Sequence, residues 1–170
     1  MTTVDARSKS REEQAVWAAL AHVMDPEIPV VSVVDLGIVR GVSINGDDVE
    51  VAVSPTYTGC PATQLIEMEI LEALQRNGYP KARVKRVLSP AWTTEWISEQ
   101  GRDKLRAYGI APPAAVKGRV SALLGEEAEV ACPRCGSRNT RKVSEFGSTP
   151  CKAHYACANC LEPFDYFKCL

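Results

Sequence analysis

The chain has 170 residues, a hydrophobic content of 45% and a formal net charge of −1. This size supports one ordinary core with a small appendage, and the near-neutral charge gives no general attraction to nucleic acid. No apolar run approaches the roughly 20 residues that a membrane-spanning helix needs. The polar residues 1–11 lack the apolar middle of a secretory signal, and an odd number of cysteines, seven, suits a reducing compartment. We therefore expect a cytoplasmic protein.

The first predicted elements are a helix and a hairpin. Over residues 12–24, apolar side chains recur at helical spacing until Pro26 ends the pattern. Apolar residues then alternate over 36–44 and again over 49–53. Asn45 and Gly46 lie between these two runs, which favours a tight turn joining two antiparallel strands.

Three more elements are expected before a linker. Residues 62–77 carry the strongest helical pattern, and Gly78 suits the left-handed end of a helix. Residues 83–88 are predicted as a third strand, and residues 98–108 as a last helix that ends at Gly109. Prolines then break the periodicity, so we expect a main domain at 12–110, a linker at 111–130 and a small domain at 131–170.

Two cysteine pairs dominate the small domain. Cys132 and Cys135 form the first pair, and Cys157 and Cys160 form the second, each with two residues between its thiols. Two such knuckles aim four thiolates at one ion, which is the pattern of a structural zinc site. A closed shell of four sulfurs leaves no position for substrate, so the zinc is expected to hold a fold together. An iron-sulfur cluster could use the same four sulfurs.

Cys60 stands alone just before the helix predicted at 62–77. The positive end of a helix dipole lowers a thiol pKa, which would suit a nucleophile or a metal ligand, whereas a buried inert cysteine is the alternative. Thr56 and Thr58 could cap this helix. Asp25 and Glu27 lie in a proline-stiffened segment that composition alone predicts to be a turn.

Further candidate residues have ordinary alternatives. Cys151 and Cys169 could be free thiols, a labile pair, alternative ligands or small buried hydrophobes. His154 is another candidate ligand, although a surface histidine is the simpler interpretation. Trp92 and Trp96 could cover a groove, but core packing is the usual fate of such side chains.

Several of these segments together resemble the MIP18-type domain, formerly a domain of unknown function, which is associated with iron-sulfur and metal-centre assembly. The motifs are Asp-Pro-Glu-Ile-Pro at 25–29, Val-Asp-Leu-Gly-Ile-Val at 34–39 and Thr-Tyr-Thr-Gly-Cys-Pro at 56–61. The resemblance continues through 89–96, 108–113 and the cysteine-rich tail. With that tail, the chain is similar to the PaaD-like accessory proteins of the phenylacetyl-CoA epoxidase complex in aerobic phenylacetate degradation.

The resemblance implies an α+β fold, with helices on one face of a small mixed sheet, followed by a β-rich zinc ribbon. It implies a non-enzymatic accessory factor that helps to assemble the iron or iron-sulfur centre of the epoxidase complex. Cys60 becomes the transient iron or cluster ligand, with Asp25, Glu27 and Thr56 around it. Many relatives have Thr-Thr-Pro-Gly before the cysteine, whereas residues 56–59 here read Thr-Tyr-Thr-Gly. A role for Thr58 is therefore less well supported than one for Thr56.

The implied partners are the oxygenase or reductase components of that complex, and a homodimer is a further hypothesis. Neither a nucleic acid nor a membrane is an expected partner. Two other functions stay open. One is a ribbon that binds protein or nucleic acid through the basic residues near the first knuckle, which are Arg134, Arg138, Arg141 and Lys142. The other is a thiol enzyme that uses Cys60, for which His22 and His154 are the available histidine bases.

Overall fold

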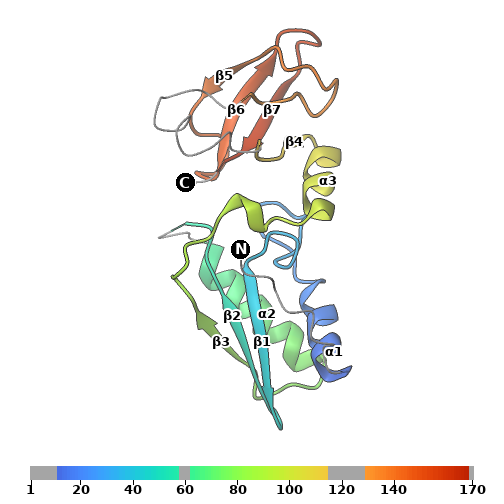
Figure 1. The fold of residues 1–170 in the computed structure, drawn as a ribbon, viewed down its shortest axis with the longest axis vertical. Helices are drawn as coiled ribbons and strands as arrows, with labels where there is room; N and C mark the ends of the chain where they lie inside the picture. Colours follow the sequence, from blue (N-terminus) through green and yellow to red (C-terminus); the bar gives the residue numbers. More distant parts are fainter. Residues whose placement is uncertain (1–10, 58–61, 115–128, 169–170) are drawn as a thin grey trace. The chain divides into compact units, whose positions relative to one another are not determined.

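A computed structural model describes residues 11–57, 62–114 and 129–168 of the chain. The chain divides into two compact units, Met1–Trp92 and Thr93–Leu170. Within the described ranges, no helix combines the length and the apolar character required to cross a membrane. Each unit has its own sheet, labelled in Figure 1.

The first unit combines two helices with a three-stranded mixed sheet. The sheet has the order β1-β2-β3, with β1 and β2 antiparallel and β3 parallel to β2. The predicted hairpin and the turn at Gly46, which has a φ of 60°, are confirmed. In chain order the elements are α1 (Arg11–Leu20), β1 (Val39–Asn45), β2 (Asp48–Val53), α2 (Ala62–Arg76) and β3 (Arg83–Arg86).

The helices cover one face of this sheet. Val49, Val51 and Val53 alternate along β2 and are buried, while the residues between them are more exposed. Helix α1 packs against α2 and β1, and α2 packs against β3. On the opposite face, Lys85 pairs with Glu50 at 3.7 Å across the β2–β3 register. One apolar and one charged face give the α+β layering that the resemblance implied.

A loop, 21–38, which is mostly buried from residue 31 onward, joins α1 to the sheet. Leu36 and Ile38, expected in the first strand, precede it, and Gly37 turns the chain between them with a φ of 66°. The Ser54 N–H donates to Ile38 O at 2.8 Å, which fixes this loop to the end of β2. Trp92 donates from Nε1 to Leu36 O at 2.9 Å and is buried, so its predicted packing in the core is confirmed.

The second unit is a four-stranded sheet preceded by helices. Its order is β4-β7-β6-β5, with β5, β6 and β7 antiparallel in turn and β4 parallel to β7. Its core joins Val130, Ala153, Tyr155 and Phe164 to two of the paired cysteines. The elements are a 3-10 helix (Thr94–Trp96), α3 (Glu99–Tyr108), β4 (Ile110–Ala111), β5 (Thr140–Ser144), β6 (Lys152–Cys157) and β7 (Pro163–Phe167).

The division between the units differs from the predicted boundary at residue 110. Ala111 was expected to begin the linker, but it pairs with Tyr166 in the β4–β7 ladder. Arg102 on α3 donates to Pro113 O at 2.9 Å and to Thr94 O at 2.7 Å. Helix α3 and strand β4 therefore belong to the compact unit that contains the cysteine pairs.

Candidate metal centre

The four paired cysteines converge at one end of the β6–β7 ladder. Their sulfur atoms all lie within 4.8 Å of one another. The Sγ atoms of Cys132 and Cys160 are 3.7 Å apart, and those of Cys135 and Cys157 are 3.6 Å apart. A tetrahedral zinc ion with bonds of about 2.3 Å sets its sulfurs about 3.8 Å apart. The donor set therefore fits a zinc ion at its centre.

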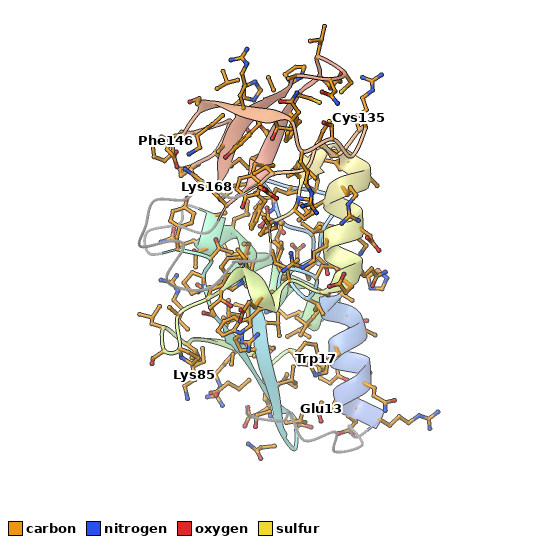
Figure 2. The ribbon with its side chains drawn as sticks, turned by 45° about the horizontal axis from the view of Figure 1, so that its top comes forward. Glu13, Trp17, Lys85, Cys135, Phe146 and Lys168 are labelled. Atoms are coloured by element: carbon orange, nitrogen blue, oxygen red, sulfur yellow. The ribbon has the colours of Figure 1, made fainter. Side chains whose placement is uncertain are left out.

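Tight backbone turns aim these thiols inward. After the first pair, Gly136 takes a φ of 73° and its N–H donates to Cys132 O at 2.9 Å. After the second pair, Leu161 takes a φ of 63°, and the Cys157 N–H donates to Glu162 O at 3.0 Å. Left-handed backbone is uncommon for leucine, so the rest of the knuckle must hold it in place. Cys135 is exposed in the first knuckle (Figure 2), whereas Cys132 and Cys157 are buried.

The electrostatics of the thiols also favour a cation. The backbone N–H of Cys160 is the main cause that lowers the pKa of the Cys157 thiol to about 6. For Cys160 the backbone N–H of Glu162 lowers the pKa, but burial and the three neighbouring thiols outweigh it and raise the pKa to about 12. Ionisation of the Cys157 thiol therefore disfavours ionisation of the Cys160 thiol beside it. A bound divalent cation would remove this conflict, because it stabilises all four thiolates.

The basic residues near the first knuckle are largely neutralised. Arg134 pairs with Glu162, and Arg138 pairs with Glu129 at 3.1 Å. Lys142 pairs with Glu145 at 3.1 Å. These carboxylates would repel phosphate, so the arrangement does not favour a nucleic-acid interface around the knuckles.

The predicted iron site is described only in part, because Cys60 and Thr58 lie outside the described residues. Asp25 is 7% exposed, and its Oδ1 accepts the N–H groups of Glu27 and Ile28, both at 2.8 Å. This carboxylate therefore caps the turn that composition predicted. Glu27 and Thr56 are half-buried.

A second buried carboxylate escaped the site prediction. Asp35 Oδ2 accepts the Ser32 N–H at 2.9 Å, and Ser32 Oγ accepts the Asp35 N–H at 3.0 Å. This reciprocal pair orders the loop just before Leu36. The signal was the serine three residues before an acidic residue, a pattern that also caps helices.

Neither Cys151 nor His154 belongs to the four-sulfur cluster. Cys151 is buried, with its Sγ 3.1 Å from Thr149 Oγ1. His154 Nδ1 lies 3.3 Å from Asp165 Oδ1, which makes this histidine part of a strand pair. His22, two residues after the end of α1, contacts Ala18 O of that helix through Nδ1 at 2.8 Å. Cys169 lies outside the described residues.

Comparison with known proteins places these features in a family. A family model named "PaaD zinc beta ribbon domain" matches residues 117–168, and one named "Iron-sulfur cluster assembly protein" matches residues 13–88. Over 155 residues the chain is 48% identical to an Escherichia coli K12 protein named as a subunit of a "Putative 1,2-phenylacetyl-CoA epoxidase", covering 91% of this chain and 92% of that protein. The chain belongs to the PaaD family. In this PaaD-family chain, the zinc-ribbon match includes the four clustered cysteines. The assembly-type match includes the β1–β2–β3 sheet.

A solved structure supports the fold of the assembly-type part of this PaaD-family chain. The crystal structure of a domain of unknown function, DUF59, from Bacillus anthracis matches with a TM-score of 0.52 and 28% identity. The match covers 55% of this chain and 90% of that domain. The α+β fold expected from the MIP18-type motifs is thereby confirmed.

Proposed function

We propose that this chain is a non-catalytic accessory factor that helps to assemble the iron or iron-sulfur centre of a phenylacetyl-CoA epoxidase complex in phenylacetate catabolism. The observation that carries the proposal is the extent of the match to the E. coli epoxidase protein, which includes both units at 48% identity. An assembly-type domain joined to a zinc ribbon suits the maturation of a metal centre. The first domain can transfer metal while the ribbon, stabilised by zinc, has a structural role.

In this proposal Cys132, Cys135, Cys157 and Cys160 hold a structural zinc ion. The ribbon core is small, and two of its buried residues are themselves ligands. Metal binding supplies folding free energy that so small a core cannot gain from burial alone. The closed four-sulfur shell leaves no open position for chemistry.

Metal transfer is assigned to the other unit. Cys60 would bind iron or a cluster, with Glu27 and Thr56 nearby, while Asp25 orders the turn that carries Glu27. One thiolate with oxygen ligands binds and releases iron more readily than four thiolates do, which suits delivery to a client protein. The clients would be the oxygenase or reductase components of the complex.

Epoxidase maturation tests the proposal. The epoxidase components are produced under iron limitation in cells lacking their own copy of this protein, with wild type, Cys60→Ser or an empty vector. Wild type is expected to raise the iron content and turnover of the purified epoxidase, and Cys60→Ser to lose most of that gain.

Cys151→Ser is the matched control, because Cys151 is a single thiol outside the four-sulfur cluster. Zinc content and thermal midpoint are measured for both variants. A Cys60→Ser protein that folds normally, keeps its zinc and still supports full epoxidase activity would refute the proposed role.

A further inference from the structure

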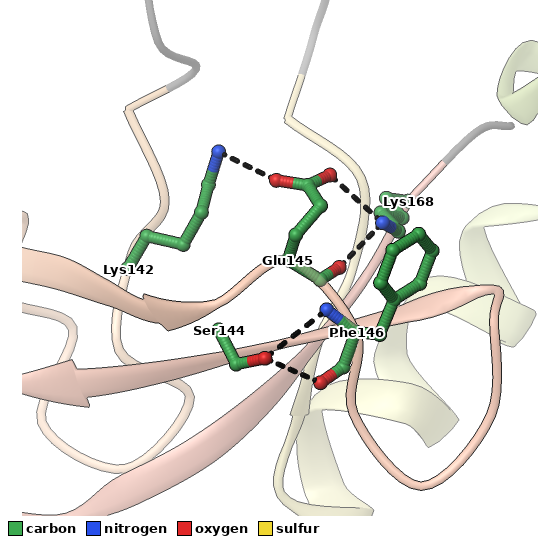
Figure 3. Close-up of polar contacts among 5 residues, drawn as sticks. All are labelled: Lys142, Ser144, Glu145, Phe146 and Lys168. Atoms are coloured by element: carbon green, nitrogen blue, oxygen red, sulfur yellow. Dashed lines mark hydrogen bonds and ion pairs between the residues drawn. The ribbon is translucent and has the colours of Figure 1, made fainter.

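Phe146, just after β5, is exposed and yet held in place. Its side chain is 58% exposed. Ser144 Oγ accepts the Phe146 N–H at 3.3 Å and donates to Phe146 O at 2.8 Å. The Lys168 ammonium lies 4.2 Å from the centre of the Phe146 ring (Figure 3). Backbone and ring are therefore both fixed before any partner arrives.

The lysine that holds the ring is itself anchored. The Lys168 side chain is only 10% exposed, and Nζ donates to Glu145 O and to Glu145 Oε1, the latter at 2.8 Å (Figure 3). Glu145 also pairs with Lys142 at 3.1 Å. Hydrogen bonds from Lys168 and then Lys142 are the main causes that lower the pKa of the Glu145 carboxyl, so it stays ionised near neutral pH. The network is complete without any ligand.

This network serves neither the zinc site nor the core of the ribbon. None of its residues belongs to the four-sulfur cluster or the buried cluster around it. Val143, three residues before Phe146, is 52% exposed at an irregularity in the β5–β6 register. An exposed aromatic ring with a fixed backbone loses little entropy on binding, which is the property of a binding hot spot.

The charges around Phe146 indicate what it would bind. We call Arg141, Lys142, Val143, Glu145, Phe146 and Lys168 the Phe146 patch. It has three cations and one carboxylate that already contacts both lysines. A second carboxylate, that of Asp165, lies beside Gly147, so the cations exceed the carboxylates by one. Arg141 is exposed on β5, an edge strand. The excess positive charge fits an acidic partner surface, and the ring fits an apolar socket.

Protein fits this patch better than nucleic acid does. Glu145 sits among the cations and would repel a phosphate backbone. The nearby Arg134 and Arg138 are directed to glutamates, so they add no extended basic track. Nucleic-acid binding depends on such phosphate contacts.

We propose that the Phe146 patch is where the ribbon docks an epoxidase component, with the ring inserted into an apolar socket rimmed by carboxylates. The inference rests on the proposed function for the identity of the partner. It assigns recognition to residues 141–146 and Lys168, and leaves metal transfer to Cys60.

Direct binding tests the patch. The zinc-loaded full-length chain is immobilised, and purified oxygenase and reductase components are passed over it. Phe146→Ala is expected to raise the Kd at least about tenfold, the size of a hot-spot effect. Tyr108→Ala is the matched control, because Tyr108 is an aromatic residue of the same unit with a similar exposure of 55%, and its Kd should stay unchanged.

Further variants separate the ring from its charges. Arg141→Glu should weaken binding and reduce its salt dependence. Lys168→Met should weaken binding, because the Phe146 ring loses the cation that holds it in place. Lys168→Arg keeps a cation there and should retain most of the affinity. Zinc content and circular dichroism show whether each variant is folded, and Phe146→Leu provides a milder change if Phe146→Ala is not.

Three outcomes would overturn the docking proposal: equal affinity for wild type and every patch variant, no binding of either epoxidase component to wild type, or Phe146-dependent binding of a single-stranded RNA probe alone. The maturation assay judges the proposed function separately. If wild type and patch variants bind equally while Cys60→Ser abolishes maturation, only the patch assignment fails.

Discussion

Asp25 uses its carboxylate to hold the protein's own backbone. One oxygen accepts two N–H groups, and the side chain is almost fully buried. The family resemblance placed Asp25 near a metal, whereas composition predicted that it lies in a turn. Its two hydrogen bonds explain the turn. A residue can thus contribute to a metal site by ordering the loop that carries a ligand such as Glu27.

Asp25→Ala should lower the free energy of unfolding of the first unit by about 1–3 kcal/mol, because the buried Ile28 N–H and the part-buried Glu27 N–H lose their acceptor. Asp25→Asn keeps an oxygen acceptor and should cost less. Hydrogen exchange of the β2 amides during urea titration measures both effects. An Asp25→Ala protein as stable as wild type would contradict the capping role.

At the scale of elements, the sequence predicted those whose hydrogen bonds join residues close together in the chain. Helix α3 was predicted with its ends: Ser98 Oγ accepts the Gly101 N–H at 2.9 Å, and Gly109 ends the helix with a φ of 91°. Strand β4 could not be predicted, because two residues carry no periodicity and its partner Tyr166 is far along the chain. The four clustered cysteines were predictable from two short spacings. The Phe146 patch was not, because Lys168 contacts Phe146 and Glu145 across more than twenty residues of sequence.

Gly109→Ala should cost about 1–2 kcal/mol, the penalty of left-handed backbone for a residue with a Cβ. An added Cβ meets no heavy atom within 4 Å there, so backbone strain is the whole effect. Gly41→Ala is the control, since its Cβ is equally unobstructed and its φ is not in the left-handed region. Hydrogen exchange of the unit that carries each change measures the cost, and equal effects at the two positions would contradict the argument.

At the scale of the whole molecule, two compact units have different sources of stability. The first buries the valines of β2 under two helices. The second has a smaller core that includes Cys132 and Cys157. Only the second should therefore depend on a metal ion.

Removing zinc with a strong chelator should unfold strands β5, β6 and β7 and leave the β1–β2–β3 sheet folded. Amide NMR spectra recorded before and after chelation, and again after zinc is returned, follow both units at once. Loss of both units together, or survival of both, would contradict the assignment of zinc to the ribbon.

Metal analysis of protein purified without oxygen tests the central claim, the division between a permanent zinc and a labile iron site. Wild type should contain one zinc per chain and additional iron that a mild chelator removes. Cys60→Ser should keep the zinc and lose the iron, while Cys157→Ser should lose the zinc. Iron that persists in Cys60→Ser, or that disappears only with Cys157→Ser, would contradict the account.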